Sequence, residues 1–307
     1  MRSHLLVPLA LAAATLLPAA RARACSVCAA GDPLVAAGDA APEGRELRTA
    51  LEAEWLTAEA EMAEMPGMIE EVDQATLRAL AVFSPLARLN AVLAVPLVQK
   101  SVSATGAGMD HGTTELTGLG DVELGARWFV LDETSFAQMR HHSVALSAGT
   151  SFPTGDDDAT RDGVRLDQHS QIGTGGWGPY AGVMYRLEQS RWHAFASLTG
   201  RWRSENAHGY RYGASLHWSL TAQRDLADGR VAVGLGIDGR QAAYDREHGE
   251  DVAHTGGLVL AAAPEAHVQV RGSWWLTARA QLPFATSLHG NQDVGPTVSA
   301  GVQFRAF

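Results

Sequence analysis

The chain has little lysine, little cysteine and, after its N-terminus, no long apolar run. Lys100 is the only lysine among its 24 basic residues, and Cys25 and Cys28 are its only cysteines. The lack of a later apolar run of about 18 residues excludes a protein that crosses a membrane with helices. Acidic residues outnumber basic ones by 34 to 24, and this net charge of −10 excludes nucleic-acid binding through counterion release.

The first 24 residues have the three parts of a secretory signal. An apolar run follows Arg2, and small residues at Ala22 and Ala24 frame a cleavage site. We therefore expect residues 1–24 to be a signal peptide that is cleaved. The next segment, 25–44, is rich in alanine and contains two prolines, which predicts a flexible lead-in rather than a strand.

Strict alternation of apolar and polar residues dominates the rest of the chain. Near the C-terminus, Val298, Val302 and Phe304 alternate with polar or small residues that end in Arg305. Successive side chains of a strand point to opposite faces, so this period of two predicts a strand between two different environments. The pattern recurs without a break in composition, which predicts a single domain over residues 45–307.

Twelve strands are expected in this domain, and the connections between them alternate in length. The expected strands are residues 46–58, 75–83, 89–98, 121–130, 142–152, 166–186, 192–203, 211–223, 231–240, 258–270, 274–284 and 294–305. Connections after even-numbered strands are short, and those after odd-numbered strands are longer and polar. A soluble β-sandwich also alternates, but it would not sort its connections by length.

These features predict an all-β fold, a closed antiparallel up-and-down transmembrane β-barrel of about 12 strands. It would lie in the bacterial outer membrane with short periplasmic turns, long extracellular loops and both termini periplasmic. Three glycines, Gly173, Gly175 and Gly176, interrupt the long sixth strand, and we interpret them as a bulge within one strand.

The lumen of such a barrel would carry charge of both signs. Strand parity assigns apolar residues to the lipid and charged residues to the interior. The predicted lumen-lining residues are Glu52, Glu54, Glu123, Arg127, Arg201, Arg203, Arg211, His217, Asp238, Arg240, Glu265, Arg279 and Arg305. Two readings stay open, a constriction that filters polar solutes and a lumen plugged by its own salt bridges, because twelve strands lie between packed small barrels and open porins.

Two small clusters could hold a disulfide or a metal. Cys25 and Cys28 form a Cys-x-x-Cys pair that would close a disulfide in the periplasm, with a metal or redox role as the alternative. Met62, Met65 and Met68 repeat every three residues among glutamates, and thioethers are soft ligands that suit Cu(I). Flexible packing within a loop is the simpler reading of these methionines. No cofactor is predicted.

Several short motifs, taken in order, resemble a known family. They include Phe83-Ser84-Pro85, Gly118-Leu119-Gly120-Asp121 and Phe152-Pro153-Thr154-Gly155-Asp156. From about residue 45 to 307 the chain resembles the outer-membrane channels called the MetA-pathway of phenol degradation family. The resemblance implies an outer-membrane barrel that moves small or hydrophobic compounds, and it supplies no catalytic motif.

We therefore expect an outer-membrane channel that passively moves a small solute, which the resemblance allows to be hydrophobic or aromatic. Its expected partners are outer-membrane lipid, the solute and the barrel assembly machinery, which would recognise the C-terminal Phe307. The alternatives are a non-conducting barrel that scaffolds or docks a partner, and a copper-related outer-membrane protein. An enzyme is disfavoured, because His142-Ser143 and His169-Ser170 are neighbours on predicted strands and would point to opposite faces.

Overall fold

A computed structural model describes residues 45–61, 67–106, 109–161 and 163–306. Outside these ranges lie the predicted signal peptide and lead-in, together with Cys25, Cys28, Met62, Met65 and Phe307. Within them, no helix is long and apolar enough to cross a membrane.

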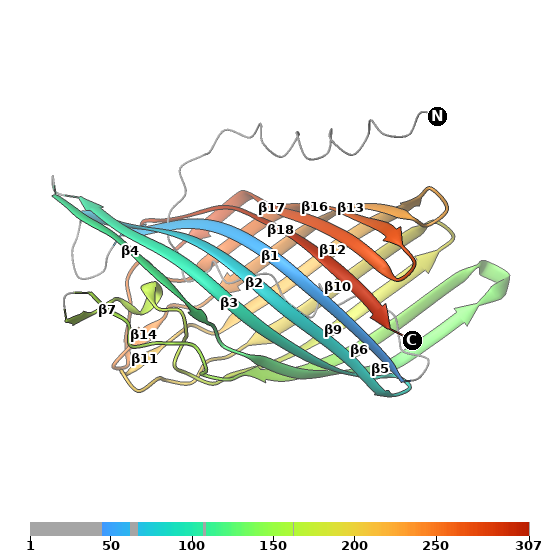
Figure 1. The fold of residues 1–307 in the computed structure, drawn as a ribbon, viewed down its shortest axis with the longest axis horizontal. Coiled ribbons are helices and arrows are strands. Elements are labelled where there is room, and N and C mark those ends of the chain that lie inside the picture. The colour runs from blue at the N-terminus through green and yellow to red at the C-terminus, as the bar shows by residue number, and fades with distance from the viewer. Residues whose placement is uncertain (1–44, 62–66, 107–108, 162, 307) are drawn as a thin grey trace.

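Twelve long antiparallel strands form the wall of one closed barrel (Figure 1). In chain order they are β1 (Glu46–Glu61), β2 (Met68–Leu86), β3 (Leu89–Gly106), β5 (Glu123–Ser135), β6 (Arg140–Ser151), β9 (Gly178–Gln189), β10 (Trp192–Arg201), β12 (Ser215–Leu226), β13 (Val231–Ala242), β16 (Gly257–Arg271), β17 (Trp274–Leu288) and β18 (Gln292–Ala306). Each strand pairs with its predecessor and successor in the wall, so the prediction of twelve up-and-down strands is confirmed.

The two ends of the barrel differ in their connections. At one end, which we call the turn end, β2–β3 and β9–β10 are each joined by two residues. At the other, the loop end, the β6–β9 connection spans residues 152–177. The predicted sorting of short and long connections is confirmed for most of the barrel, but β17 and β18 are joined at the loop end by residues 289–291 alone, because both strands extend into the expected loop. The start of β1 and the end of β18 both lie at the turn end (Figure 1).

The first and last strands close the barrel. β1 and β18 pair along almost their whole length, from Leu47 opposite Ala306 to Ala60 opposite Gln292. An open sheet would leave a row of unpaired N–H and C=O groups on each edge strand. Pairing β1 with β18 satisfies these groups within the wall, which a strand in hydrocarbon requires.

Side chains alternate between the two faces of the wall as the sequence predicts. Leu220 on β12 and Leu235 on β13 are 56% and 63% exposed, because they point outward. Val82, Val92 and Tyr180 are buried together inside the barrel. The outer face is thus apolar, and the lumen holds most of the polar and charged side chains.

The outward position of Leu220 gives a first prediction. Leu220→Arg is expected to lower the free energy of unfolding in lipid vesicles by about 2–4 kcal/mol, because it places a charge against hydrocarbon. Gln223→Arg is the matched control on the same strand. Its side chain faces the lumen, where Gln223 already bonds Glu265, so a change below about 1 kcal/mol is expected. Urea titration followed by tryptophan fluorescence measures both, and equal losses would contradict the assigned faces.

The second long connection differs from the prediction. Residues 100–120 were expected to form a loop, but β3 continues to Gly106 and pairs with β4 (Met109–Leu119) as a long hairpin. Thr, Ser and Val residues favour strand structure here. Val102 of the extension is buried in a small apolar cluster with Ala58 and Val72. This extension places Lys100 on the wall rather than in a loop.

The expected sixth strand, 166–186, is wrong in its first half. β9 begins at Gly178, and the residues before it belong to the β6–β9 connection with β7 (Thr160–Arg161), β8 (Val164–Arg165) and the short 3-10 helix η2 (Gln168–Ser170). Gly175 has a positive φ of 66°, which ends any extended run. The glycines therefore mark a loop that turns inward and not a bulge. Three further short strands lie at the loop end: β11 (Tyr210–Arg211), β14 (Arg246–Glu247) and β15 (Glu250–Asp251).

Candidate functional site in the barrel lumen

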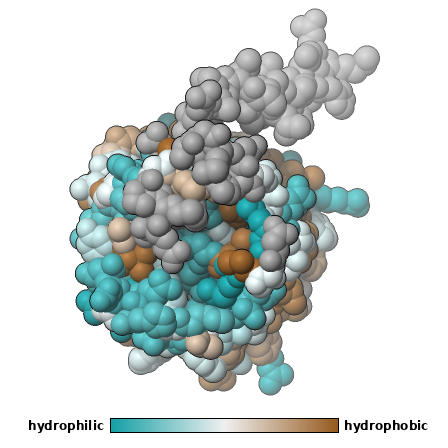
Figure 2. Space-filling model, turned by 90° about the vertical axis from the view of Figure 1, so that its left-hand side faces the viewer, coloured by the Kyte–Doolittle hydropathy of each residue, from teal (hydrophilic) through white to brown (hydrophobic). Residues whose placement is uncertain are grey.

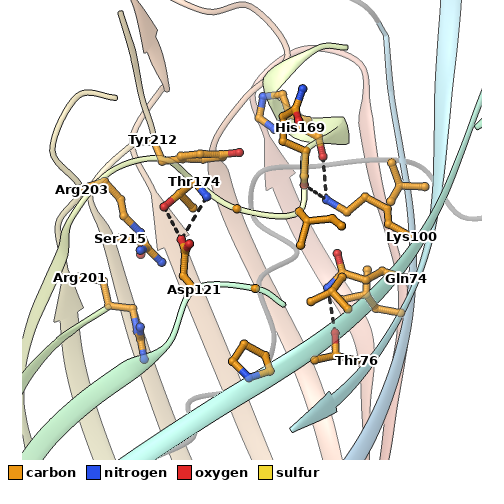
Figure 3. A pocket seen from close by; sticks show the side chains of 18 of the residues that line it. Gln74, Thr76, Lys100, Asp121, His169, Thr174, Arg201, Arg203, Tyr212 and Ser215 are labelled. Carbon is orange, nitrogen blue, oxygen red and sulfur yellow. Dashed lines mark hydrogen bonds between the residues drawn. The ribbon is translucent and has the colours of Figure 1, made fainter. Parts of the chain in front are cut away.

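A cavity of about 260 Å³ lies inside the barrel near the loop end (Figure 3). Its wall comes from β1, β2 and β3 on one side and from β10, β12 and β13 on the other. Residues 171–174 of the β6–β9 connection complete the lining. Seen from the loop end, hydrophilic residues surround the mouth of the barrel, and a hydrophobic patch is visible within it (Figure 2).

Lys100 holds the inward part of the β6–β9 connection, residues 168–174, which we call the plug segment. Lys100 is buried on β3, and its Nζ donates to the carbonyl oxygens of His169 at 3.0 Å and Gln171 at 2.6 Å. From β2, the carboxylate of Glu70 accepts a hydrogen bond from the Ser170 hydroxyl. Bonds to charged groups are the stronger class of hydrogen bond, so these contacts fix the segment against the wall.

Asp121, between β4 and β5, ties both ends of this connection together. Its carboxylate accepts hydrogen bonds from the backbone N–H groups of Gly155 and Thr174, each at 3.1 Å. Gly173 packs so closely on Gly155 that a Cβ at position 173 would overlap the Gly155 backbone. The plug segment can approach its own loop because glycine has no side chain there.

Two tyrosines from the β10–β12 connection brace the plug segment. The Tyr210 hydroxyl donates to Asp245 at 2.7 Å and lies 2.7 Å from Nε2 of His169. The Tyr212 hydroxyl donates to the carbonyl oxygen of Gln168 at 2.9 Å. Burial, reinforced by the Asp245 carboxylate, raises the pKa of both phenols far above their usual range. Both hydroxyls therefore stay protonated and act as donors at any physiological pH.

Positive charge gathers on the β10, β12 and β13 side of the cavity. Arg201 forms a two-point ion pair with Glu123, at 2.8 and 3.3 Å. Arg201, Arg203 and Arg240 line the cavity together with His217. Burial and the neighbouring Arg201 lower the pKa of Arg203, which lies just beyond β10. A guanidinium remains charged even so, and this wall of the cavity is cationic.

A second set of charges lies beneath the cavity, toward the turn end. This charged layer consists of Arg78, Glu52, Glu54, Arg279, Asp238 and Glu265. Nη2 of Arg279 lies 2.7 and 2.8 Å from the two carboxylate oxygens of Asp238, and Nη1 pairs with Glu265. Nη1 of Arg78 lies 3.1 Å from Glu52. These pairs link neighbouring and next-nearest strands across the inner face of the wall.

The predicted lumen residues fall into groups. Lining the cavity are Glu123, Arg201, Arg203, His217 and Arg240. In the charged layer are Glu52, Glu54, Asp238, Glu265 and Arg279. Arg127 is 0% exposed on β5, closer to the turn end than Glu123. The structure thus brings most of these residues together inside the barrel, while their part in selecting a solute stays a prediction.

Three predicted site residues fall elsewhere. Arg211 was expected on a wall strand, but β12 begins only at Ser215, and Arg211 lies exposed on the short loop strand β11. Arg305 lies on β18, but its side chain is not among those that the structure describes. Met68 is buried at the start of β2, 5% exposed, and its two companion methionines are outside the described residues. The copper reading of this cluster therefore stays a prediction.

Sequence reasoning missed several residues of the site. Arg78 could have been found, because it shares the inward parity of Thr76 on β2. Lys100 had the right parity too, but it was placed in a loop. Asp121 could also have been found, because it begins the expected strand 121–130 with the parity of Glu123. His169 and Tyr212 reach the cavity only through the folding of loops at the loop end, which strand parity does not predict.

The two Ser/His neighbours behave differently from each other. His142 and Ser143 lie on β6, and the buried Ser143 faces inward, as expected for neighbours on a strand. His169 and Ser170 lie on η2 instead, so the strand argument does not apply to them. Ser170 nevertheless donates to Glu70, whereas His169 contacts Tyr210, and the pair does not form a nucleophile and its base.

The closed twelve-stranded fold is that of an outer-membrane β-barrel. A solved outer membrane channel from Pseudomonas putida F1 has the same fold, with a TM-score of 0.65 and 16% identity over 87% of this chain and 97% of that one. The chain belongs to the family described as "Putative MetA-pathway of phenol degradation", which it matches over residues 77–289.

Weaker similarities carry no argument about function. The translocator domain of the autotransporter NalP from Neisseria meningitidis matches at a TM-score of 0.47 and 13% identity, over 89% of this chain and 94% of that domain. The CymD monoaromatic hydrocarbon channel matches at 0.41 and 9% identity, over 85% and 88% of the two chains. No curated protein matches the sequence.

Proposed function

We propose that this protein is a passive outer-membrane channel that moves a small solute through its lumen. The observation that carries the proposal is the cavity inside the closed barrel, which is lined by polar and charged side chains. Above it lies the plug segment, which is held to the wall by hydrogen bonds from Lys100. A barrel that only anchored itself in lipid would gain nothing from burying so many charges, since each must be desolvated.

The barrel would stand with its turn end in the periplasm and its loop end at the cell surface. Long loops on the outer side and short turns on the inner side are the rule for bacterial outer-membrane barrels. Both termini would then be periplasmic, and the C-terminal Phe307 would engage the barrel assembly machinery. The β3–β4 hairpin and the plug segment would meet the solute first.

The plug segment would act as the gate. It is fixed by Lys100, Glu70 and Asp121, three charged side chains whose hydrogen bonds can be exchanged for water when the segment moves. Below it, the charged layer would narrow the path to the periplasm and exclude large solutes. The solute would move down its own concentration gradient, and no catalytic step is proposed.

The main rival is a non-conducting barrel that scaffolds or docks a partner, and ion conductance separates the two. Purified protein in planar lipid bilayers is expected to give single-channel steps, and vesicles that contain it are expected to swell in arabinose faster than in raffinose. The matched control is protein with the plug segment cross-linked to the wall, which should give neither. A folded barrel with no steps and no swelling would reject the channel.

A further inference from the structure

A second hollow lies at the loop end, beside the lumen cavity, and we call it the rim hollow. Its volume is about 410 Å³, and its lining comes from the β10–β12 connection, residues 202–214, and the β13–β16 connection, residues 243–256. Arg203, Tyr212 and Gly213 line both the rim hollow and the lumen cavity, so these residues separate the two spaces. Passage of a solute through the lumen does not require the rim hollow.

Trp202, which lines the rim hollow, places it on the outer face of the barrel. Arg201, the residue before it, points into the lumen and bonds Glu123, so Trp202 points outward, where it is 51% exposed. Its ring covers Gly200 of β10, because a Cβ at that position would lie 3.0 Å from the ring. Aromatic side chains on the outside of a barrel gather where the apolar band meets the lipid headgroups. The rim hollow therefore lies at the level of the headgroups.

Two arginines stand next to each other in the rim hollow. Arg211 of β11 and Arg246 of β14 are directly opposite in an antiparallel pair, and β11 and β14 lie side by side at the loop end (Figure 1). Directly opposite residues project from the same face of a sheet, and like charges in such positions repel each other. An anion placed between the two guanidinium groups would replace this repulsion with charge-assisted hydrogen bonds to both.

The acidic residue of the lining does not fill the space between these arginines. It is Asp251 of β15, whose carboxylate lies 3.0 Å from Nε of Arg246. Because β14 lies between β11 and β15, Asp251 is on the side of Arg246 that is remote from Arg211. Among the residues that the structure describes, Arg211 has no acidic partner of its own.

The other two acidic residues of this small sheet point away from the rim hollow. Glu247 and Glu250 are paired across β14 and β15, and Glu247 is directly opposite Tyr210 of β11. Tyr210 turns its hydroxyl inward to Asp245, so this row of side chains lies on the face opposite to that of the two arginines. The outward face of the sheet therefore presents two guanidinium groups against one carboxylate.

Aromatic and apolar surface borders the two arginines. Tyr244 is 40% exposed and lines the rim hollow on its β13 side, as Trp202 does on its β10 side. Leu198 and Leu216 are exposed on the outer face of the wall, next to Trp202 in the direction of the turn end. A ligand that fits all three parts is an amphiphile with a phosphate for the arginines, a sugar for the rings and acyl chains for the leucines.

We propose that the rim hollow binds the headgroup of a phosphorylated glycolipid of the outer leaflet, with a phosphate between Arg211 and Arg246 and acyl chains along Leu198 and Leu216. The volume of about 410 Å³ lies within the roughly 300–1,000 Å³ of ligand sites, which suits one phosphorylated sugar ring. Basic pockets at the membrane surface recognise phosphorylated lipid headgroups in this way. The inference goes beyond the proposed channel and shares only its orientation, with the loop end at the cell surface.

Native mass spectrometry of the full-length barrel in detergent tests the proposal with three probes. Diphosphoryl lipid A is expected to bind at least about tenfold more tightly than lipid A without its phosphates, because only the first accepts charge-assisted bonds. Inorganic pyrophosphate, which has the anion without the acyl chains, is also expected to bind at least about tenfold more weakly than diphosphoryl lipid A. Equal affinities for the two lipids would overturn the proposal, and pyrophosphate that binds as tightly as lipid A would assign the rim hollow to a soluble anion instead.

Two double variants distinguish the rim hollow from positive charge in general. Arg211→Gln with Arg246→Gln is expected to weaken the binding of diphosphoryl lipid A by at least about tenfold. Arg191→Gln with Arg271→Gln is the matched control, because it removes two exposed arginines at the turn end, and binding should stay within about twofold. Resistance of the folded band to detergent at room temperature shows whether each variant is folded. Equal weakening by both variants, or none by the first in a folded barrel, would contradict the assigned site.

The outcomes also separate this inference from the proposed channel. Phosphate-dependent binding of lipid A to a barrel that gives no flux would reject the channel and keep the rim hollow as a lipid site. Flux through a barrel that binds both forms of lipid A equally would keep the channel and reject the lipid site.

Discussion

Lys100→Met is expected to raise the flux of arabinose into vesicles by about 100-fold. Nζ of Lys100 makes two hydrogen bonds to carbonyl oxygens of the plug segment, at 3.0 and 2.6 Å. Hydrogen bonds to a charged donor are worth about 1.5–3 kcal/mol each, so the loss of two shifts the equilibrium between closed and open plug segment by at least about two powers of ten. Methionine is unbranched and only one atom shorter than lysine, but it donates no hydrogen bond to His169 or Gln171.

The conservative variant controls for the loss of the side chain itself. Lys100→Arg retains a charged donor at the same position, and its flux is expected to stay within about threefold of the parent protein. If the methionine variant is folded and its flux equals that of the parent protein, Lys100 does not hold the plug segment closed.

Because the chain has a single lysine, the role of Lys100 can also be tested by chemical modification of its amine. Acetylation removes the charge of the amine, whereas reductive methylation preserves it. Acetylated protein is expected to reproduce the flux of the methionine variant, and methylated protein is not. The Lys100→Arg variant, treated in the same way, reports any effect of the N-terminal amine.

Arg279→Met is expected to destabilise the barrel by about 3–5 kcal/mol. Arg279 bonds both oxygens of Asp238 and also pairs with Glu265, and these carboxylates are largely buried. Removing the shared cation leaves two negative charges without their partner in the charged layer. Urea titration in vesicles measures the loss in the free energy of unfolding.

A rescue variant shows whether the loss in the free energy of unfolding comes from the unpaired carboxylates of Asp238 and Glu265. Adding Asp238→Asn and Glu265→Gln to Arg279→Met removes both charges and is expected to recover most of the loss. A cost below about 1 kcal/mol for Arg279→Met alone would mean that water solvates these groups. The charged layer would then be a water-filled passage and would not constrict the lumen.

The sequence was sufficient for the wall of the barrel because alternation is a local property. Because the two faces of each strand meet different surroundings, the outward position of Leu220 and Leu235 follows from the residues of their own strands. The same strand parity predicted that Glu123, Arg201 and Arg240 face the lumen. The closure of β1 on β18 follows from the requirement that no strand edge meets hydrocarbon.

The loop end could not be read in the same way. The plug segment has no periodicity, and its position depends on contacts between residues far apart in sequence, such as Lys100 with His169 and Asp121 with Thr174. Glycines at 173, 175 and 176 are compatible in sequence with a bulge and with a loop, and contacts in three dimensions, such as the packing of Gly173 on Gly155, decide between them. Polar side chains that meet through loops leave no pattern in the sequence.

The central claim, that solute passes through the lumen when the plug segment moves, has one direct test. With Cys25→Ser and Cys28→Ser as background, cysteines at Ser170 and Glu70, whose side chains are hydrogen-bonded, can be joined by a short reducible thiol cross-linker. The account predicts that arabinose flux into vesicles stops after cross-linking and returns on reduction. Equal flux in the cross-linked and reduced protein would contradict it.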